Sequence, residues 1–210
     1  MKKIIVIGAG GHAKVIADII IKRKKLLNEA IKIEAFLDEK YETKEIVYQD
    51  IPLIGKLNKI NSLKKDDYYF IIAIGNNSIR EKIANNYDLK YYTAVHPSAI
   101  LAEDVEVGEG TVIMANAVIN SSVEVASHCI INTSSVIEHD NKIDDFVHIS
   151  PNAALAGNVK VGKKSWVGMG SSIIQGVKIG MNAKIGAGSV VLNNIDDNIT
   201  AYGVPCRERY

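Results

Sequence analysis

Every sixth residue in the second half of the chain is aliphatic. From Leu101 onward sixteen successive positions follow this rule, and the position two residues earlier is small or β-branched in nearly every case, with Asn141 as the main departure. The sixteen positions are Leu101, Val107, Ile113, Ile119, Val125, Ile131, Ile137, Ile143, Ile149, Leu155, Val161, Val167, Ile173, Ile179, Ile185 and Val191. A helix would scatter these side chains around its axis, and a plain strand would alternate every two residues. Six-residue sides, three to a coil of about 18 residues, place the aliphatics inside and the small residues at the corners, which predicts a hexapeptide β-helix.

The first half of the chain follows a different pattern, in which short β-rich runs alternate with helical ones. A glycine-rich turn joins the first strand to the first helix, so the pattern predicts a βαβ unit with a small parallel sheet. The expected elements are strands over residues 3–7, 33–37 and 68–74 and helices over 12–25 and 78–85.

The change of pattern near residue 95 predicts an α/β, Rossmann-like nucleotide-sugar-binding domain over residues 1–95. A β-helix follows over 96–192, and a C-terminal tail over 193–210. A three-sided prism has flat outer faces, and outward-pointing apolar residues such as Val136 and Trp166 favour packing on sister faces. We therefore expect a closed homotrimer.

Composition excludes several classes of function. The 25 Lys+Arg and 24 Asp+Glu residues give a net charge of +1, so no summed field attracts nucleic acid or an anionic membrane surface. No apolar run approaches the ~20 residues of a membrane span, so we expect no membrane insertion. The two cysteines, Cys129 and Cys206, make no disulfide framework, and the histidines lack metal spacing. A reducing cytoplasm fits best.

The turn over residues 8–13 (GAGGHA) partly fits the dinucleotide-binding fingerprint, with Ala13 in the third glycine position. Backbone N–H groups at a helix N-terminus suit a phosphate or pyrophosphate, so Gly10, Gly11 and His12 are candidate ligand contacts. About 95 residues are few for a full dinucleotide fold, which favours a nucleotide sugar over NAD. A purely structural turn and an NAD-dependent module are the alternatives.

Three segments carry a resemblance to a known family. They are residues 4–12 (IIVIGAGGH) ahead of the unbroken hexads, residues 72–80 (IAIGNNSIR) and residues 131–140 (INTSSVIEHD). Together they resemble the sialic acid O-acyltransferase / UDP-N-acetylbacillosamine N-acetyltransferase family of left-handed β-helix enzymes. The resemblance implies a left-handed coil, a homotrimer and acetyl-CoA as co-substrate, with no metal. The last two segments are most similar to the bacillosamine enzymes, which favours an amine acceptor over a hydroxyl.

The resemblance implies that His139 is the general base and that Asp140 orients its ring, with Glu138 as the second choice. An imidazole titrates near neutral pH and can take the proton of an attacking sugar amine. Coil spacing adds Gly157, which lies one coil further along the same corner, where its N–H could donate to the thioester oxygen. His148 lies half a coil from His139, so a site that uses both must combine two subunits. An exposed wall residue without a role is the alternative for His148.

Further contacts follow from the resemblance. Asn132 matches a residue that holds the pantetheine arm or orients the substrate, and a simple corner turn is its alternative. Coenzyme A is expected in the groove between prisms, beside His148, Gly157, Gly168, Met169 and Ala187. The nucleotide sugar is expected on the N-terminal domain, beside Gly10, Gly11, His12, Asp38, Glu39, Gly75, Asn76, Asn77 and Arg80.

The sequence thus predicts an acetyl-CoA-dependent acetyltransferase that acts on the C4 amine of a UDP-4-amino sugar in surface glycan biosynthesis. Transfer would be direct, from a ternary complex. The alternatives are an O-acetyltransferase of sialic acid or a related sugar, and a non-catalytic β-helix scaffold that binds a nucleotide sugar.

Overall fold

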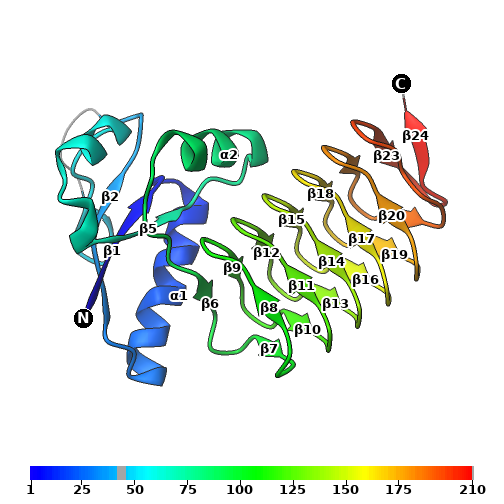
Figure 1. Cartoon of the computed structure of the whole chain (residues 1–210), viewed down its shortest axis with the longest axis horizontal. Helices are drawn as coiled ribbons and strands as arrows, with labels where there is room; N and C mark the ends of the chain where they lie inside the picture. The colour runs from blue at the N-terminus through cyan, green and yellow to red at the C-terminus, as the bar shows by residue number, and fades with distance from the viewer. Residues whose placement is uncertain (42–45, 210) are drawn as a thin grey trace. The chain divides into compact units, whose positions relative to one another are not determined.

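The computed structural model describes residues 1–41 and 46–209, which form two compact units (Figure 1). The first unit comprises Met1–Pro97, and the second begins at Ser98. The division between them lies close to the point at which the sequence pattern changes.

The first unit contains a parallel sheet with the strand order β2-β1-β5. Its β1 strand is an unbroken apolar run whose residues Ile4 to Ile7 are buried, as expected for a parallel strand that is covered on both faces. The principal elements are β1 (Lys2–Ile7), α1 (Gly11–Leu27), β2 (Ile31–Leu37), β5 (Tyr69–Ile72), α2 (Asn77–Asn86) and β6 (Ala94–Val95). The predicted βαβ unit and its parallel sheet are confirmed.

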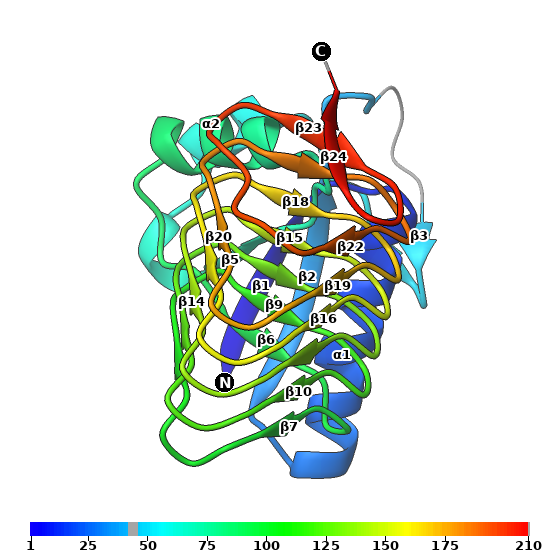
Figure 2. The same ribbon diagram turned by 90° about the vertical axis from the view of Figure 1, so that its right-hand side faces the viewer.

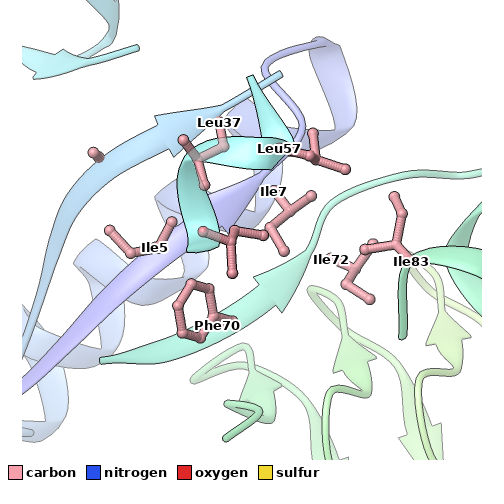
Figure 3. Close-up of a cluster of buried hydrophobic side chains, with 9 residues drawn as sticks. Ile5, Ile7, Leu37, Leu57, Phe70, Ile72 and Ile83 are labelled. Atoms are coloured by element: carbon pink, nitrogen blue, oxygen red, sulfur yellow. The ribbon is translucent and has the colours of Figure 1, made fainter. Parts of the chain in front are cut away.

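A cluster of buried apolar side chains packs against this sheet (Figure 3). Phe70 of β5 lies in it, together with Leu57 and with Ile83 of α2. Burial of large aliphatic and aromatic side chains supplies most of the stability of such a unit. Through Ile83 the cluster also holds α2 against β5, and the loop that joins these two elements contains the predicted ligand contacts Gly75 and Asn76.

Five short elements of the first unit were not predicted from the sequence. They are β3 (Ile46–Tyr48), β4 (Ile51–Pro52), η1 (Leu57–Ser62), η2 (Lys65–Asp67) and β6 (Ala94–Val95). Elements of two to six residues are too short to show a hydrophobic period, which explains the omission. The third strand also ends at Ile72, two residues earlier than expected.

The second unit is a parallel β-helix with strands on three walls (Figure 2). The first wall contains β7 (Ile100–Leu101), β10 (Val118–Ile119), β13 (Val136–Ile137), β16 (Ala154–Leu155), β19 (Ser172–Ile173) and β22 (Val190–Val191). The second contains β8 (Glu106–Val107), β11 (Glu124–Val125), β14 (Lys142–Ile143), β17 (Lys160–Val161) and β20 (Lys178–Ile179). The third contains β9 (Val112–Ile113), β12 (Ile130–Ile131), β15 (His148–Ile149), β18 (Trp166–Val167), β21 (Lys184–Ile185), β23 (Thr200–Tyr202) and β24 (Arg207–Arg209).

The register of these walls confirms the hexad interpretation. Equivalent residues of successive coils pair directly, as Ile119 does with Ile137. The hexad aliphatics are buried from Ile113 to Val191. Leu101 and Val107 are only half-buried, because β7 and β8 each pair with a strand on one side only.

The corners of the coil have a fixed backbone geometry. Residues six positions apart adopt the left-handed conformation, among them Ser134, Asp140 and Phe146, with φ values of 56°, 60° and 60°. Asp and Asn tolerate this conformation better than other non-glycine residues. At the C-terminal end β23 pairs in parallel with β21, and β24 returns antiparallel to β23, so these two strands extend the third wall.

Candidate functional site

His139 lies in the corner turn between β13 and β14, with its side chain exposed. Its Nδ1 atom is 2.7 Å from Oδ2 of Asp140, which occupies the left-handed position of the same turn. Because a carboxylate accepts hydrogen bonds and does not donate them, Nδ1 carries the proton of a neutral ring. Nε2 is then the basic nitrogen and faces away from this pair. An imidazole oriented in this way can act as a general base.

Gly157 lies under the ring of His139, as coil spacing predicted. A Cβ atom built on Gly157 would come within 2.6 Å of Cε1 and 2.8 Å of Nε2 of His139. The next residue, Asn158, donates its N–H to the carbonyl of His139 at 2.9 Å. Within the described residues the N–H of Gly157 takes no part in the hydrogen bonding between coils. This N–H therefore stays available to a ligand beside the imidazole.

Glu138 and Asn141, two neighbours of His139, make hydrogen bonds that were not predicted from the sequence. Glu138, the second choice to orient the ring, accepts a hydrogen bond from Nδ2 of Asn120 at 2.8 Å. Asn141, the departure from the small-residue rule, is completely buried and bonds to backbone groups around His139. A polar residue at a position that is apolar in the other coils was the sequence signal that could have identified Asn141 as part of the site.

His148 lies on the third wall, whereas His139 lies at the corner between the first and second walls. The His148 ring is buried and stacks on Trp166 at 5.1 Å, and Trp166 Nε1 donates to Ser150 Oγ at 2.7 Å. Nε2 of His148 is 3.1 Å from Nδ2 of Asn132. The Asn132 Oδ1 atom accepts from Thr133 N, so the amide presents its donor to the imidazole.

A cavity of about 440 Å³ opens beside His148 and Trp166. Four of the residues predicted to contact coenzyme A, namely His148, Gly168, Met169 and Ala187, line this cavity together with Lys184. Asn132 meets the site only through its bond to His148, and Gly157 belongs to the His139 corner. The sequence thus predicted one group of neighbouring residues on the third wall and a second at the His139 corner.

The first unit has a cavity of about 620 Å³ at the carboxyl ends of β1, β2 and β5. Parallel α/β sheets bind ligands at this edge. The predicted contacts Gly10, Gly11, His12, Asp38, Glu39 and Gly75 all line the cavity. Gly10 is the N-cap of α1 and has no side chain to occupy the first N–H groups of the helix, which stay open to an anion.

The two acidic residues after β2 also organise the loops of this cavity. Asp38 accepts the N–H of Ala9 through Oδ2 at 2.8 Å and the N–H of Lys40 through Oδ1 at 2.9 Å. Glu39 accepts the N–H of Leu57 at 3.3 Å. Asp38 therefore holds the glycine-rich turn in place, in addition to any ligand contact.

Asn76, Asn77 and Arg80 lie beside the cavity without lining it. Asn76 caps α2 by accepting the N–H of Ile79 at 3.0 Å. Arg80 is 1% exposed, and its guanidinium donates to the carbonyls of Ile74 and Gly75 and to Oδ1 of Asn77. These residues shape the loop after β5, and their contact with a ligand stays a prediction.

His12 is a mostly buried imidazole at the start of α1. Burial, and then the positive charge of Arg80, lower the pKa of His12 from 6.5 to about 4. Its Nε2 atom is buried with no hydrogen-bond partner in the described part of the chain. At neutral pH the cavity is therefore lined by a neutral imidazole.

Acidification should destabilise the protein through His12. Between pH 6.5 and about 4 the unfolded chain binds a proton that the folded chain excludes, so the free energy of unfolding falls as the pH falls. These pKa values correspond to a loss of about 2 kcal/mol between pH 7 and pH 5. Urea unfolding at both pH values should show that the free energy of unfolding of His12→Gln falls by about 2 kcal/mol less than that of the wild type. Equal losses in the two proteins would contradict the assignment.

Two classes of site are not formed by the part of the chain that the structure describes. Residues 1–41 and 46–209 contain no group of three or more His, Cys, Asp or Glu side chains arranged to hold a metal ion. None of the helices in these ranges combines the length and the apolar character that a bilayer crossing requires.

Comparison with known proteins defines the class. A model of the PglD N-terminal domain matches residues 3–87, and a model of the bacterial transferase hexapeptide, with six repeats, matches residues 158–193. The fold is a Rossmann-like domain followed by a left-handed β-helix of the hexapeptide-repeat transferase class.

Individual relatives narrow the class to a family. The acetyltransferase domain of PglB from Neisseria gonorrhoeae FA1090 is 34% identical, with a TM-score of 0.91 and coverage of 100% of both chains. PerB from Caulobacter crescentus, solved with CoA and GDP-perosamine, is 31% identical, with a TM-score of 0.89 over 100% of this chain and 98% of that one. The chain belongs to the sialic acid O-acyltransferase / UDP-N-acetylbacillosamine N-acetyltransferase family, as its motifs predicted.

A curated relative shares part of the chain. The UDP-N-acetylbacillosamine N-acetyltransferase of Bacillus subtilis (strain 168) is 41% identical over 119 residues, which cover 54% of this chain. The match spans 52% of the length of that relative, about half.

Proposed function

We propose that the protein is an acetyl-CoA-dependent N-acetyltransferase of a nucleotide-linked amino sugar, with the C4 amine of a UDP-4-amino sugar as acceptor. The observation that carries the proposal is the His139–Asp140 pair, 2.7 Å apart, set over the backbone of Gly157. It combines an oriented base with a free N–H donor one coil away. Acyl transfer from a thioester to an amine needs both.

In the proposed reaction the sugar amine attacks the carbonyl carbon of the thioester. Nε2 of His139 accepts the proton of the attacking nitrogen, and Asp140 stabilises the imidazolium that forms. The N–H of Gly157 donates to the oxyanion on the former carbonyl oxygen. Collapse of the intermediate breaks the C–S bond, and the sulfur of coenzyme A leaves with the proton from the imidazolium. The acetyl group never bonds to the protein.

We assign one substrate to each of the two cavities. The cavity of the first unit, with the open start of α1 and the loops held by Asp38, suits a pyrophosphate and a nucleoside. The cavity beside His148 and Trp166 suits coenzyme A. Relatives named for UDP-N-acetylbacillosamine and for GDP-perosamine support a nucleotide-linked amino sugar as acceptor. We assign the product to surface glycan assembly and the reaction to the cytoplasm.

We further propose that the active form is a homotrimer. His139 and His148 lie on different parts of one prism, so a site that contains both needs the third wall of a neighbouring copy. Outward-pointing apolar side chains on the walls, such as Ile100 and Trp166, favour such packing. Light scattering of the active protein should give the mass of three chains, and an active monomer would contradict this assembly.

One assay tests the acceptor. The protein is incubated with acetyl-CoA and, separately, a UDP-4-amino sugar, a GDP-4-amino sugar and sialic acid, and free thiol is followed. Release with the UDP-4-amino sugar above all is the expected result. Release only with the GDP sugar changes the nucleotide, and release only with sialic acid changes the chemistry to O-acetylation. If no acceptor causes thiol release, the non-catalytic scaffold is favoured. Tight binding of NADH, measured in a separate titration, would favour the NAD-dependent module.

A further inference from the structure

Asn141 is the one polar corner residue on its edge of the described β-helix. Five other corner positions of that edge are apolar, namely Val105, Val123, Val159, Val177 and Ile195. A buried amide needs hydrogen-bond partners to offset its loss of hydration. Asn141 is 0% exposed, and it finds those partners around the candidate base.

The Asn141 side chain joins two successive coils. Its Nδ2 donates to the carbonyl of Ala156 at 3.0 Å, and its Oδ1 accepts from the N–H of Val159 at 3.1 Å. Hydroxyl groups make the same pair of bonds on another edge. Thr111 donates to the carbonyl of Ala126 at 2.8 Å and accepts from the N–H of Cys129 at 2.9 Å. This part of the Asn141 network is therefore a general device of the fold.

A second part of the network is specific to the site. Nδ2 of Asn141 also donates to the carbonyl of Glu138 at 2.5 Å and contacts the carbonyl of His139 at 3.3 Å. These two carbonyls belong to the peptide groups on either side of the His139 Cα atom. One buried amide therefore fixes the backbone that carries the imidazole.

The bond to Ala156 has a further consequence. The carbonyl of Ala156 and the N–H of Gly157 belong to one planar peptide group, in which the two bonds point in opposite directions. By holding this carbonyl towards the interior, Asn141 directs the N–H of Gly157 outward, towards the position beside the imidazole.

We propose that Asn141 is a positioning residue that holds the general base and the oxyanion donor in one hydrogen-bond network. The inference rests on the proposed function, because it assigns a role in that reaction. Displacement of catalytic groups by about 1 Å can lower a rate by about 10²-fold. A loss of kcat with little change in KM is the result expected of a residue that aligns groups for the transition state without touching a substrate.

The test compares Asn141→Val with Thr111→Val. Valine is the residue that the same edge uses in neighbouring coils, so Asn141→Val should fold. It should lower kcat by about 10-fold or more and change KM for both substrates by less than about 2-fold. Thr111→Val removes the same kind of inter-coil bonds at an edge remote from His139. It should lower the melting temperature to a similar extent and leave kcat unchanged.

Asn141→Thr separates the two parts of the network. A threonine can keep the bonds to Ala156 and Val159, as Thr111 keeps its own, but loses those to Glu138 and His139. Its kcat should lie between wild type and Asn141→Val, and it carries the test if the valine variant does not fold. Wild-type kcat in both Asn141 variants, or an equal loss in Thr111→Val, would overturn the proposal. An inactive wild type, or an active His139→Ala, would instead overturn the proposed function.

Discussion

His139→Ala should lower kcat by about 10²-fold or more and leave the fold intact. The sugar amine is a poor nucleophile while its proton has no acceptor, and general base catalysis typically contributes 10²–10⁴-fold. The His139 side chain is exposed at a corner, so its removal leaves no cavity in the core. Single-turnover thiol release at saturating acetyl-CoA and UDP-4-amino sugar measures the loss.

Lys160→Ala is the matched control for this variant. Lys160 is an exposed residue of β17 on the second wall, outside both candidate cavities. It should retain wild-type kcat and the same melting temperature. If His139→Ala kept wild-type turnover in a folded protein, the base would have to be another residue.

Gly157→Ala should lower kcat by about 10-fold to 10²-fold with a melting temperature close to that of wild type. The new Cβ atom would overlap the imidazole of His139, at 2.6 Å from Cε1. The ring is the outer end of an exposed side chain, so it can rotate away at little cost to the fold. Its rotation breaks the 2.7 Å contact with Asp140 and misplaces Nε2 for proton transfer. Steady-state kinetics with thermal unfolding of the same preparation checks both halves of the expectation.

Gly55→Ala is the control for a glycine substitution. A Cβ atom on Gly55 would meet only the flexible side chain of Lys59, at 3.2 Å, so kcat should stay at the wild-type value. If Gly157→Ala also kept the wild-type kcat, the position of the His139 ring over the backbone of residue 157 would not be required for turnover.

The periodic part of the fold could be read directly from the sequence. A solenoid buries the same position of each repeat, so the aliphatic hexads fix the walls, the corners and the stacking of Gly157 on His139 without knowledge of distant contacts. The pairing of His139 with Asp140 could also be predicted, because residues 131–140 resemble the catalytic segment of a known family.

The roles of Arg80 and Asn141 could not be predicted in this way. Arg80 follows a glycine–asparagine turn, and packing of α2 buries it among the carbonyls of its own loop. In the sequence Asn141 is only a departure from the repeat, and its role becomes clear from the four backbone groups that it contacts. In both cases the partners of a buried polar group are set by tertiary contacts, which a local pattern does not contain.

The direct stacking of equivalent residues, as in the pairing of Ile119 with Ile137, restricts how this protein can change in length. A single inserted residue between His139 and Gly157 would turn every later aliphatic out of the interior and move the glycine off the corner of the base. Addition or removal of one complete coil after Gly157 would preserve both the buried aliphatics and the stacking of Gly157 on His139. The distance along the prism between the chemistry and the C-terminal end can therefore change only in steps of a whole turn, about 4.8 Å each.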